Sequence, residues 1–105
     1  MENQTAAVKP TKVYDMVLAT DSVWEQVKQH FSLTNREVQV GRMMCQGDKT
    51  KQIQSKLDIS DKTVSSIKNF LYKKIDAQCI EDCIRILMTE AIEIYLVTTL
   101  MGNKG

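Results

Sequence analysis

The segment from Thr50 to Asn69 constrains the fold most, because it holds two short amphipathic stretches separated by only three residues. The first stretch, Thr50–Leu57, has apolar Ile53 and Leu57 one helical turn apart. The second begins at Asp61, and its apolar residues recur at helical spacing: Val64, Ile67 and Leu71. The pattern predicts two helices joined by a tight turn, which is a helix-turn-helix.

The residues at the predicted turn have the chemistry that such a turn requires. Ser60 is a good N-cap, because its hydroxyl can accept a hydrogen bond from the amide near Thr63. Asp61 places negative charge at the positive end of the helix dipole. Asp58 stands where we expect a left-handed residue, a conformation that Asp tolerates better than most residues.

A third helix is predicted upstream of this pair. Thr34 and Glu37 fit a capping box, in which each side chain bonds the backbone amide of the other residue. The helix should run from Asn35 to Gln46 and stop at Gly47, the usual residue past a helix end.

These segments, taken in order, resemble the DNA-binding domain of the LuxR/FixJ type. Leu33-Thr34-Asn35-Arg36-Glu37 is similar to the family's L-T-x-R-E opening, and Gln46-Gly47 to its Q-G break. Lys51-Gln52-Ile53 resembles K-E-I, the run from Leu57 to Val64 resembles L-G-I-S-E-K-T-V, and the run from Leu71 to Ile75 resembles L-x-x-K-L. The resemblance covers residues 33–88 and implies a stand-alone small regulator that binds DNA.

Three positions depart from the family pattern. Gln54 replaces a small residue where the two helices of the motif pack, so we expect it to tilt outward or to open the packing. Ile67 stands where family members often have His. Gly41 replaces a large apolar residue; because Gly inside a helix costs about 1 kcal/mol relative to Ala, we expect a side chain to pack closely there, with Trp24 and Phe31 as candidates.

Charge is concentrated in the predicted motif. The whole chain carries a net charge of only +1, but between Leu33 and Asp76 nine basic residues face five acidic ones, which leaves +4 on this segment. Such an asymmetry is typical of a nucleic-acid interface, although solvated surfaces often have it too.

The geometry of the motif assigns roles to particular side chains. We expect the helix from Asp61 to Ile75 to enter the major groove with its N-terminal half. The side chains opposite its apolar stripe are then the candidates for base contacts: Lys62, Ser65, Ser66 and Asn69. Residues at the edges of the motif are the candidates for phosphate contacts: Thr50, Lys51, Lys68 and Lys73. A polar face that is merely solvated is the alternative.

Two extensions flank the core. Residues 1–11 are expected to form a flexible tail, and residues 12–31 one broken helix or two short helices with a break at Thr20-Asp21-Ser22. The core is expected at residues 32–76, and residues 77–105 should hold a long C-terminal helix. The β-branched run from Ile92 to Thr99 leaves a strand as the alternative for part of it.

The C-terminal helix is apolar on nearly every side and must therefore be covered. In the resembled family this helix forms the dimer contact. We expect the interface to include five residues of one stripe: Ile84, Leu87, Ala91, Ile94 and Tyr95. The alternative is that Val13, Trp24, Val27 and Phe31 cover this stripe within the same chain.

Other classes of protein find little support. The segment from Ile80 to Met101 contains Arg85, Glu90 and Glu93, so it is a poor membrane span, and no signal peptide is visible. The lone histidine, His30, has no catalytic motif beside it, and Cys79 and Cys83 lack further metal ligands. We therefore expect no enzyme activity, no cofactor, no metal and no membrane contact, and a cytoplasmic location with reduced thiols.

The sequence thus predicts an all-α helix-turn-helix bundle of the LuxR/FixJ type with an N-terminal helical extension and a long C-terminal helix. The expected function is sequence-specific transcription regulation by a homodimer on double-stranded DNA. The alternative is an antagonist that pairs with another transcription regulator through the apolar C-terminal helix and binds little DNA itself.

Overall fold

The computed structural model describes residues 11–101, which form six helices. The predicted tail, residues 1–11, lies outside this range except for Thr11, and so do residues 102–105. Along the described residues no strand interrupts the helices, so the all-α prediction is confirmed and the alternative of a strand over residues 92–99 is wrong.

The N-terminal extension consists of two helices, α2 (Thr11–Ala19) and α3 (Asp21–Phe31), and the break falls at Thr20 as predicted. A left-handed Ser32, with φ of 57°, ends α3, and its amide donates to carbonyls in the last turn of that helix. The indole Nε1 of Trp24 donates to the carbonyl of Val17 at 3.0 Å, which joins α3 to α2.

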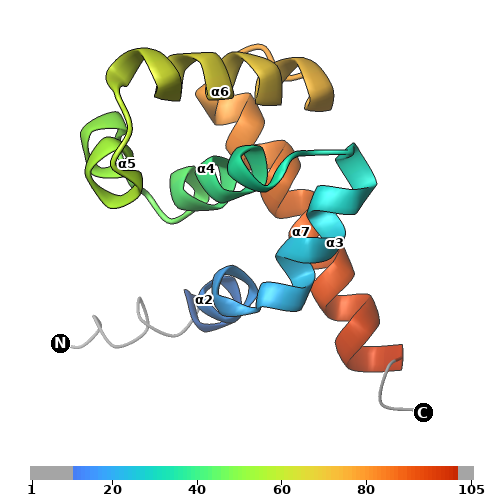
Figure 1. The fold of residues 1–105 in the computed structure, drawn as a ribbon. Coiled ribbons are helices and arrows are strands. Elements are labelled where there is room, and N and C mark those ends of the chain that lie inside the picture. Colours follow the sequence, from blue (N-terminus) through green and yellow to red (C-terminus); the bar gives the residue numbers. More distant parts are fainter. Residues whose placement is uncertain (1–10, 102–105) are drawn as a thin grey trace, which may run out of the picture.

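The core of the motif is formed by α4 (Asn35–Cys45), α5 (Thr50–Leu57) and α6 (Asp61–Ile75). The capping box predicted for α4 is present: Thr34 Oγ1 accepts from the amide of Glu37 at 3.1 Å, and Glu37 Oε1 accepts from the amide of Thr34 at 2.9 Å. In Figure 1 α6 lies along one edge of the molecule, with α4 directly inside it.

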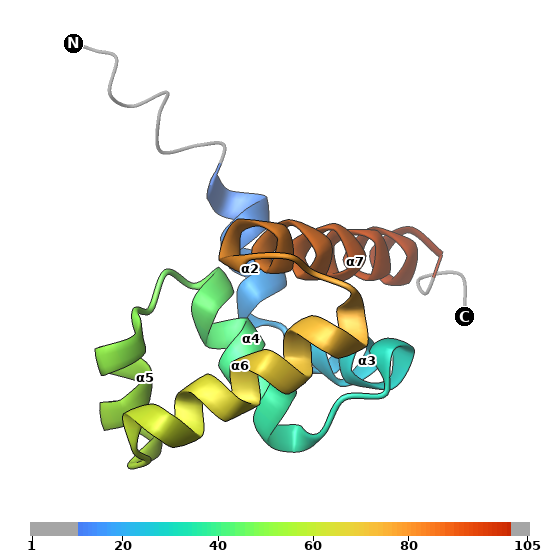
Figure 2. The same ribbon diagram turned by 90° about the horizontal axis from the view of Figure 1, so that it is seen from above.

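The last helix, α7 (Ile80–Met101), is the longest, with 22 residues. It packs against α2, α3, α4 and α6, so it links the N-terminal extension to the helix-turn-helix. Figures 1 and 2 show that the loop after α6 turns back along that helix before α7 begins, and that α7 then runs past α3. Its final turns therefore lie far from α5 and from the start of α6.

The central packing differs from the sequence prediction at Gly41. A Cβ added there would meet Leu87 Cδ1 at 2.8 Å and Leu71 Cδ2 at 3.3 Å. The residues that pack over Gly41 are therefore Leu87 of α7 and Leu71 of α6, and the prediction of Trp24 and Phe31 was wrong. A residue without a side chain at Gly41 lets α4 fit tightly between α6 and α7.

Candidate nucleic-acid interface

The turn between α5 and α6 is built from the residues that the sequence singled out. Asp58 adopts the left-handed conformation, with φ of 55° and ψ of 52°. Ser60 Oγ accepts from the amide of Thr63 at 3.1 Å and so caps α6. These local bonds end α5 and begin α6 within three residues, which fixes the angle between the two helices.

The apolar stripe of α6 faces inward. Val64, Leu71 and Ile75 are buried, and Ile67 is half-buried. Ile53 of α5 is fully buried as well, while its neighbour Gln54 is half-buried. Gln54 therefore does not open the packing between α5 and α6, since Ile53 and Val64 both remain inaccessible to solvent.

The four residues proposed to contact bases all lie exposed on α6. At 100° per residue, the side of α6 opposite the buried stripe carries Lys62, Ser66 and Asn69, and Ser65 lies at the margin of that outer side. No side-chain hydrogen bond or ion pair joins any of the four to another residue between 11 and 101. Their donors and acceptors are thus directed at solvent and are available to a ligand.

The residues proposed to contact phosphates divide into two groups. Lys68 Nζ donates to Thr50 Oγ1 at 3.0 Å, which brings the start of α5 and the middle of α6 together at one edge of the motif. Lys51 and Lys73 are exposed, and within the described part of the chain no acidic side chain pairs with either. Their charge is consequently not neutralised by the protein itself.

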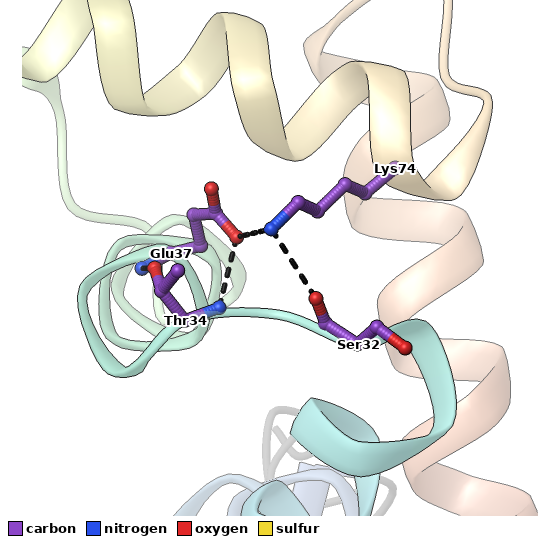
Figure 3. A network of polar contacts seen from close by, with 4 residues as sticks. All are labelled: Ser32, Thr34, Glu37 and Lys74. Atoms are coloured by element: carbon purple, nitrogen blue, oxygen red, sulfur yellow. Dashed lines mark hydrogen bonds and ion pairs between the residues drawn. The ribbon is translucent and has the colours of Figure 1, made fainter.

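Lys74, the neighbour of Lys73, is held by the protein instead (Figure 3). Its Nζ lies 2.8 Å from Glu37 Oε1 and donates to the carbonyl of Ser32 at 3.2 Å. Glu37 is buried, with 6% of its surface exposed, and the same oxygen also accepts from the amide of Thr34. The contact joins the C-terminal end of α6 to the N-terminal end of α4 and to the end of α3.

This network determines the ionisation of Glu37. Burial acts to raise the pKa of the Glu37 carboxyl, but the hydrogen bonds from Lys74 and Thr34 outweigh it, and the pKa lies below its ordinary value. Glu37 is thus ionised at neutral pH and pairs with the Lys74 ammonium. The sequence identified Glu37 as a capping residue only; its second partner is 37 positions away, and no local pattern indicates that pair.

The residues expected at a dimer interface occupy two different environments. Leu87 and Ala91 are buried within the single chain, with exposed fractions of 1% and 0%, so neither offers a free surface to a second copy. Ile84, Ile94 and Tyr95 are half-buried, and Tyr95 Oη lies 3.7 Å from Met16 Sδ of α2. The N-terminal helices therefore cover part of α7, as in the alternative: Trp24 and Val27 are buried, Phe31 is half-buried, and Val13 is exposed.

The outer side of α7 carries further apolar residues, beyond the five listed for the expected interface. Leu96, Val97 and Leu100 are exposed, Leu100 by 70%, and half-buried Ile92 continues the row one turn earlier. We name Ile92, Leu96, Val97 and Leu100 the outer stripe. On α6 one large apolar residue, Phe70, is exposed among polar neighbours. It lies outside the apolar stripe, and it has no hydrogen-bonding group that would indicate a base contact.

The three cysteines are free thiols. Burial and the neighbouring Cys83 raise the pKa of Cys45 to about 12. Burial also raises the pKa of Cys83 to about 12, although the charge of Lys68 opposes the rise. Both thiols are protonated at neutral pH, and the structure assigns them to core packing.

Comparison with known proteins agrees with this geometry. A family model described as bacterial regulatory proteins, luxR family, matches residues 31–87, more than half of the chain. The match begins at the end of α3 and includes the whole helix-turn-helix and the first turns of α7. Searches of curated proteins and of solved structures give no match.

Proposed function

The chain belongs to the luxR family of bacterial regulatory proteins and carries the DNA-binding domain of that family, and we propose that it reads a specific DNA sequence as a homodimer. The luxR family is a family of transcription regulators rather than of enzymes. Between residues 11 and 101 no helix has the length and apolar character needed to cross a membrane.

One observation carries the sequence-reading part of this proposal. The outer face of α6 presents Lys62, Ser66 and Asn69 together, exposed and without side-chain partners among the described residues. Asn can bond adenine in a bidentate manner, Lys can bond guanine, and Ser can bond several base edges. An amphipathic helix with this outer face fits the major groove, which accommodates one α-helix.

The phosphate contacts support the same placement. Thr50 and half-buried Lys68 lie together at one edge of the motif, Lys51 and Lys73 are exposed, and three of the four are cationic. Lysines that release counterions from phosphates give binding that weakens as salt increases. We propose that these four residues hold the DNA backbone while α6 reads the bases.

The experiment is a selection of duplexes from a random library by the full chain, followed by fluorescence-anisotropy titration at two salt concentrations. Enrichment of one sequence, with affinity that falls steeply as salt rises, is the expected result. Replacing Lys68 with Ala should weaken binding to all sequences alike and lower the salt slope by about one unit. Equal affinity for selected and random duplexes would contradict sequence-specific reading.

Assembly is proposed from the outer stripe of α7. Contiguous exposed apolar residues usually mark an interface, and Leu87 and Ala91 are already occupied inside the chain. A two-fold dimer through the outer stripe would bury these residues and present two recognition helices to a pseudo-palindromic site. Leu100→Glu should give a monomer that binds the selected duplex more weakly. Ser22→Glu adds the same charge at an exposed position of α3 and should leave assembly and DNA affinity unchanged.

Sedimentation of the wild-type chain provides the direct check of assembly. A dimer that dissociates on dilution and that Leu100→Glu abolishes is the expected result. A wild-type chain that remains monomeric at every concentration, both free and on DNA, would contradict the dimer.

The same exposed stripe supports a second candidate, an antagonist that pairs with another transcription regulator. In that case Leu96, Val97 and Leu100 would contact the other regulator, and DNA binding by this chain would be weak. The selection experiment distinguishes the two, because an antagonist enriches no duplex and lowers the DNA affinity of its partner.

A further inference from the structure

Phe70 is the one large apolar side chain of α6 that lies exposed on the surface of the helix. Phenylalanine is usually buried, yet 55% of Phe70 is exposed. The inward side of α6 is already filled by Val64, Leu71 and Ile75. Phe70 precedes Leu71 by one residue and is therefore rotated about 100° away from the core.

The position of Phe70 places it beside the residues proposed to contact DNA. Ser66 lies one turn before it and Asn69 directly before it, while Lys73 lies three residues after it on the same side. Lys74, one turn after Phe70, is fixed to Glu37 and to the carbonyl of Ser32. That contact holds the second half of α6 against α4, so the backbone at Phe70 is anchored in place.

The surroundings of Phe70 favour DNA over a protein as its partner. The other large apolar residues exposed between residues 11 and 101 lie on α2 and α7: Val13, Tyr14, Met16, Ile80, Leu96, Val97, Leu100 and Met101. Phe70 has polar or cationic neighbours on its own exposed side, namely Ser66, Asn69 and Lys73. A protein interface would need further exposed apolar residues around its aromatic anchor, and the nearest apolar neighbour on α6, Ile67, is half-buried against the core.

The apolar group that the major groove presents is the C5-methyl of thymine. We propose that Phe70 determines specificity by packing its ring on a thymine methyl in the major groove. The inference rests on the proposed reading of DNA by α6. It adds recognition of thymine by apolar contact to the hydrogen bonds of Lys62, Ser66 and Asn69.

Replacement of thymine by deoxyuracil tests the contact directly, since it removes only the methyl group and leaves base pairing intact. In the duplex selected by the full chain, each thymine is replaced in turn and the affinity is measured. Removing the contacted methyl should weaken binding of the wild-type chain by about fourfold, the value of one buried methyl group. Phe70→Ala should bind the thymine and deoxyuracil duplexes equally, and Phe70→Leu should retain part of the difference.

Matched variants separate this role from general effects. Ser66→Ala changes a residue one turn away, and this variant should still bind the deoxyuracil duplex about fourfold more weakly than the thymine duplex. Thermal unfolding of Phe70→Ala should match that of the wild-type chain, because Phe70 is mostly exposed.

The outcomes distinguish this inference from the function on which it rests. A wild-type chain that enriches no duplex contradicts both. Specific binding that no deoxyuracil replacement weakens, or an equal loss for the wild-type chain and Phe70→Ala, overturns the role of Phe70 and leaves sequence-specific binding intact. Phe70→Ala that binds DNA normally but sediments as a smaller species would place Phe70 at a protein interface, which also overturns it.

Discussion

The outer face of α6 and the outer stripe of α7 belong to helices with the same internal construction but opposite surfaces. Each helix buries an apolar stripe, Val64, Leu71 and Ile75 in α6 and Cys83, Leu87 and Ala91 in α7. On its other side α6 presents polar and cationic residues around a single Phe, whereas α7 presents Leu96, Val97 and Leu100. From this difference we expect the outward residues, rather than the helical scaffold, to select the partner.

The two surfaces should respond to solution conditions in opposite ways. Lysines that contact phosphates give binding that weakens with salt, while burial of apolar side chains depends much less on screening. DNA binding and assembly can therefore be separated by experiment, when a variant on one surface is compared with a matched variant elsewhere in the chain.

The largest effect is expected from two leucines of the same helix. Leu87→Ala should lower the free energy of unfolding by about 2–5 kcal/mol, because Leu87 is buried against Gly41. Leu100→Ala, at a position that is 70% exposed, should change it by no more than about 0.5 kcal/mol. Urea unfolding at low protein concentration, where any dimer is dissociated, measures both values; equal losses would show that the burial of Leu87 is not as described.

The next effect concerns base reading by the outer face of α6. Asn69→Ala should change the preferred base at one position of the selected site, with a loss of discrimination of about 1–3 kcal/mol. Gln26→Ala, an exposed amide on α3, is the control and should leave the preference unchanged. A selection repeated with each variant gives the result, and an unaltered binding site for Asn69→Ala would remove Asn69 from the base-contacting residues.

Two consecutive lysines of α6 should behave differently when removed. Lys74→Ala leaves the Glu37 carboxylate buried without its cation, so unfolding should become easier by about 1–3 kcal/mol. Lys73→Ala should leave stability nearly unchanged and lower the slope of DNA affinity against salt by about one unit. Thermal unfolding and salt titrations of DNA binding are measured on both variants. A stability loss for Lys73→Ala with unchanged stability for Lys74→Ala would contradict the prediction.

The smallest expected effect is the dependence of stability on acid. Because the pKa of Glu37 is lower in the folded chain than in the unfolded chain, its ionised form stabilises the fold above about pH 4.3, the ordinary value for Glu. This stabilisation disappears as the pH falls through the lowered pKa. Glu37→Gln should therefore flatten the decline in unfolding free energy below that pH, and Glu93→Gln, on an exposed part of α7, should not; similar curves for both variants would contradict the prediction.

Local patterns predicted much of the helix-turn-helix correctly. Thr34 and Ser60 cap their helices, and Asp58 takes the left-handed conformation, as the sequence indicates. Each of these features depends on bonds between residues at most a few positions apart. The same is true of the break at Thr20 and of the separation of α6 into an inward and an outward side.

Predictions that required distant partners were less successful. The Gly41 contact was assigned to Trp24 and Phe31, although Leu71 and Leu87 make it. The pair between Glu37 and Lys74 was not foreseen, and Leu87 and Ala91 were expected at a dimer interface although the chain buries them itself. A helical repeat shows that residues share one side of a helix, but it does not show which other helix covers that side.

The sequence by itself therefore determined the helices, their caps and the side of α6 that carries Lys62, Ser66 and Asn69, because these follow from short-range hydrogen bonds and helical spacing. Only the tertiary structure decided that Lys74 is bound by Glu37 while Lys73 is free of any described partner, and that α2 and α3 cover one side of α7 and leave its outer stripe exposed. The physical reason is that burial depends on how helices distant in the sequence pack together, and residues of identical chemistry acquire different roles from that packing.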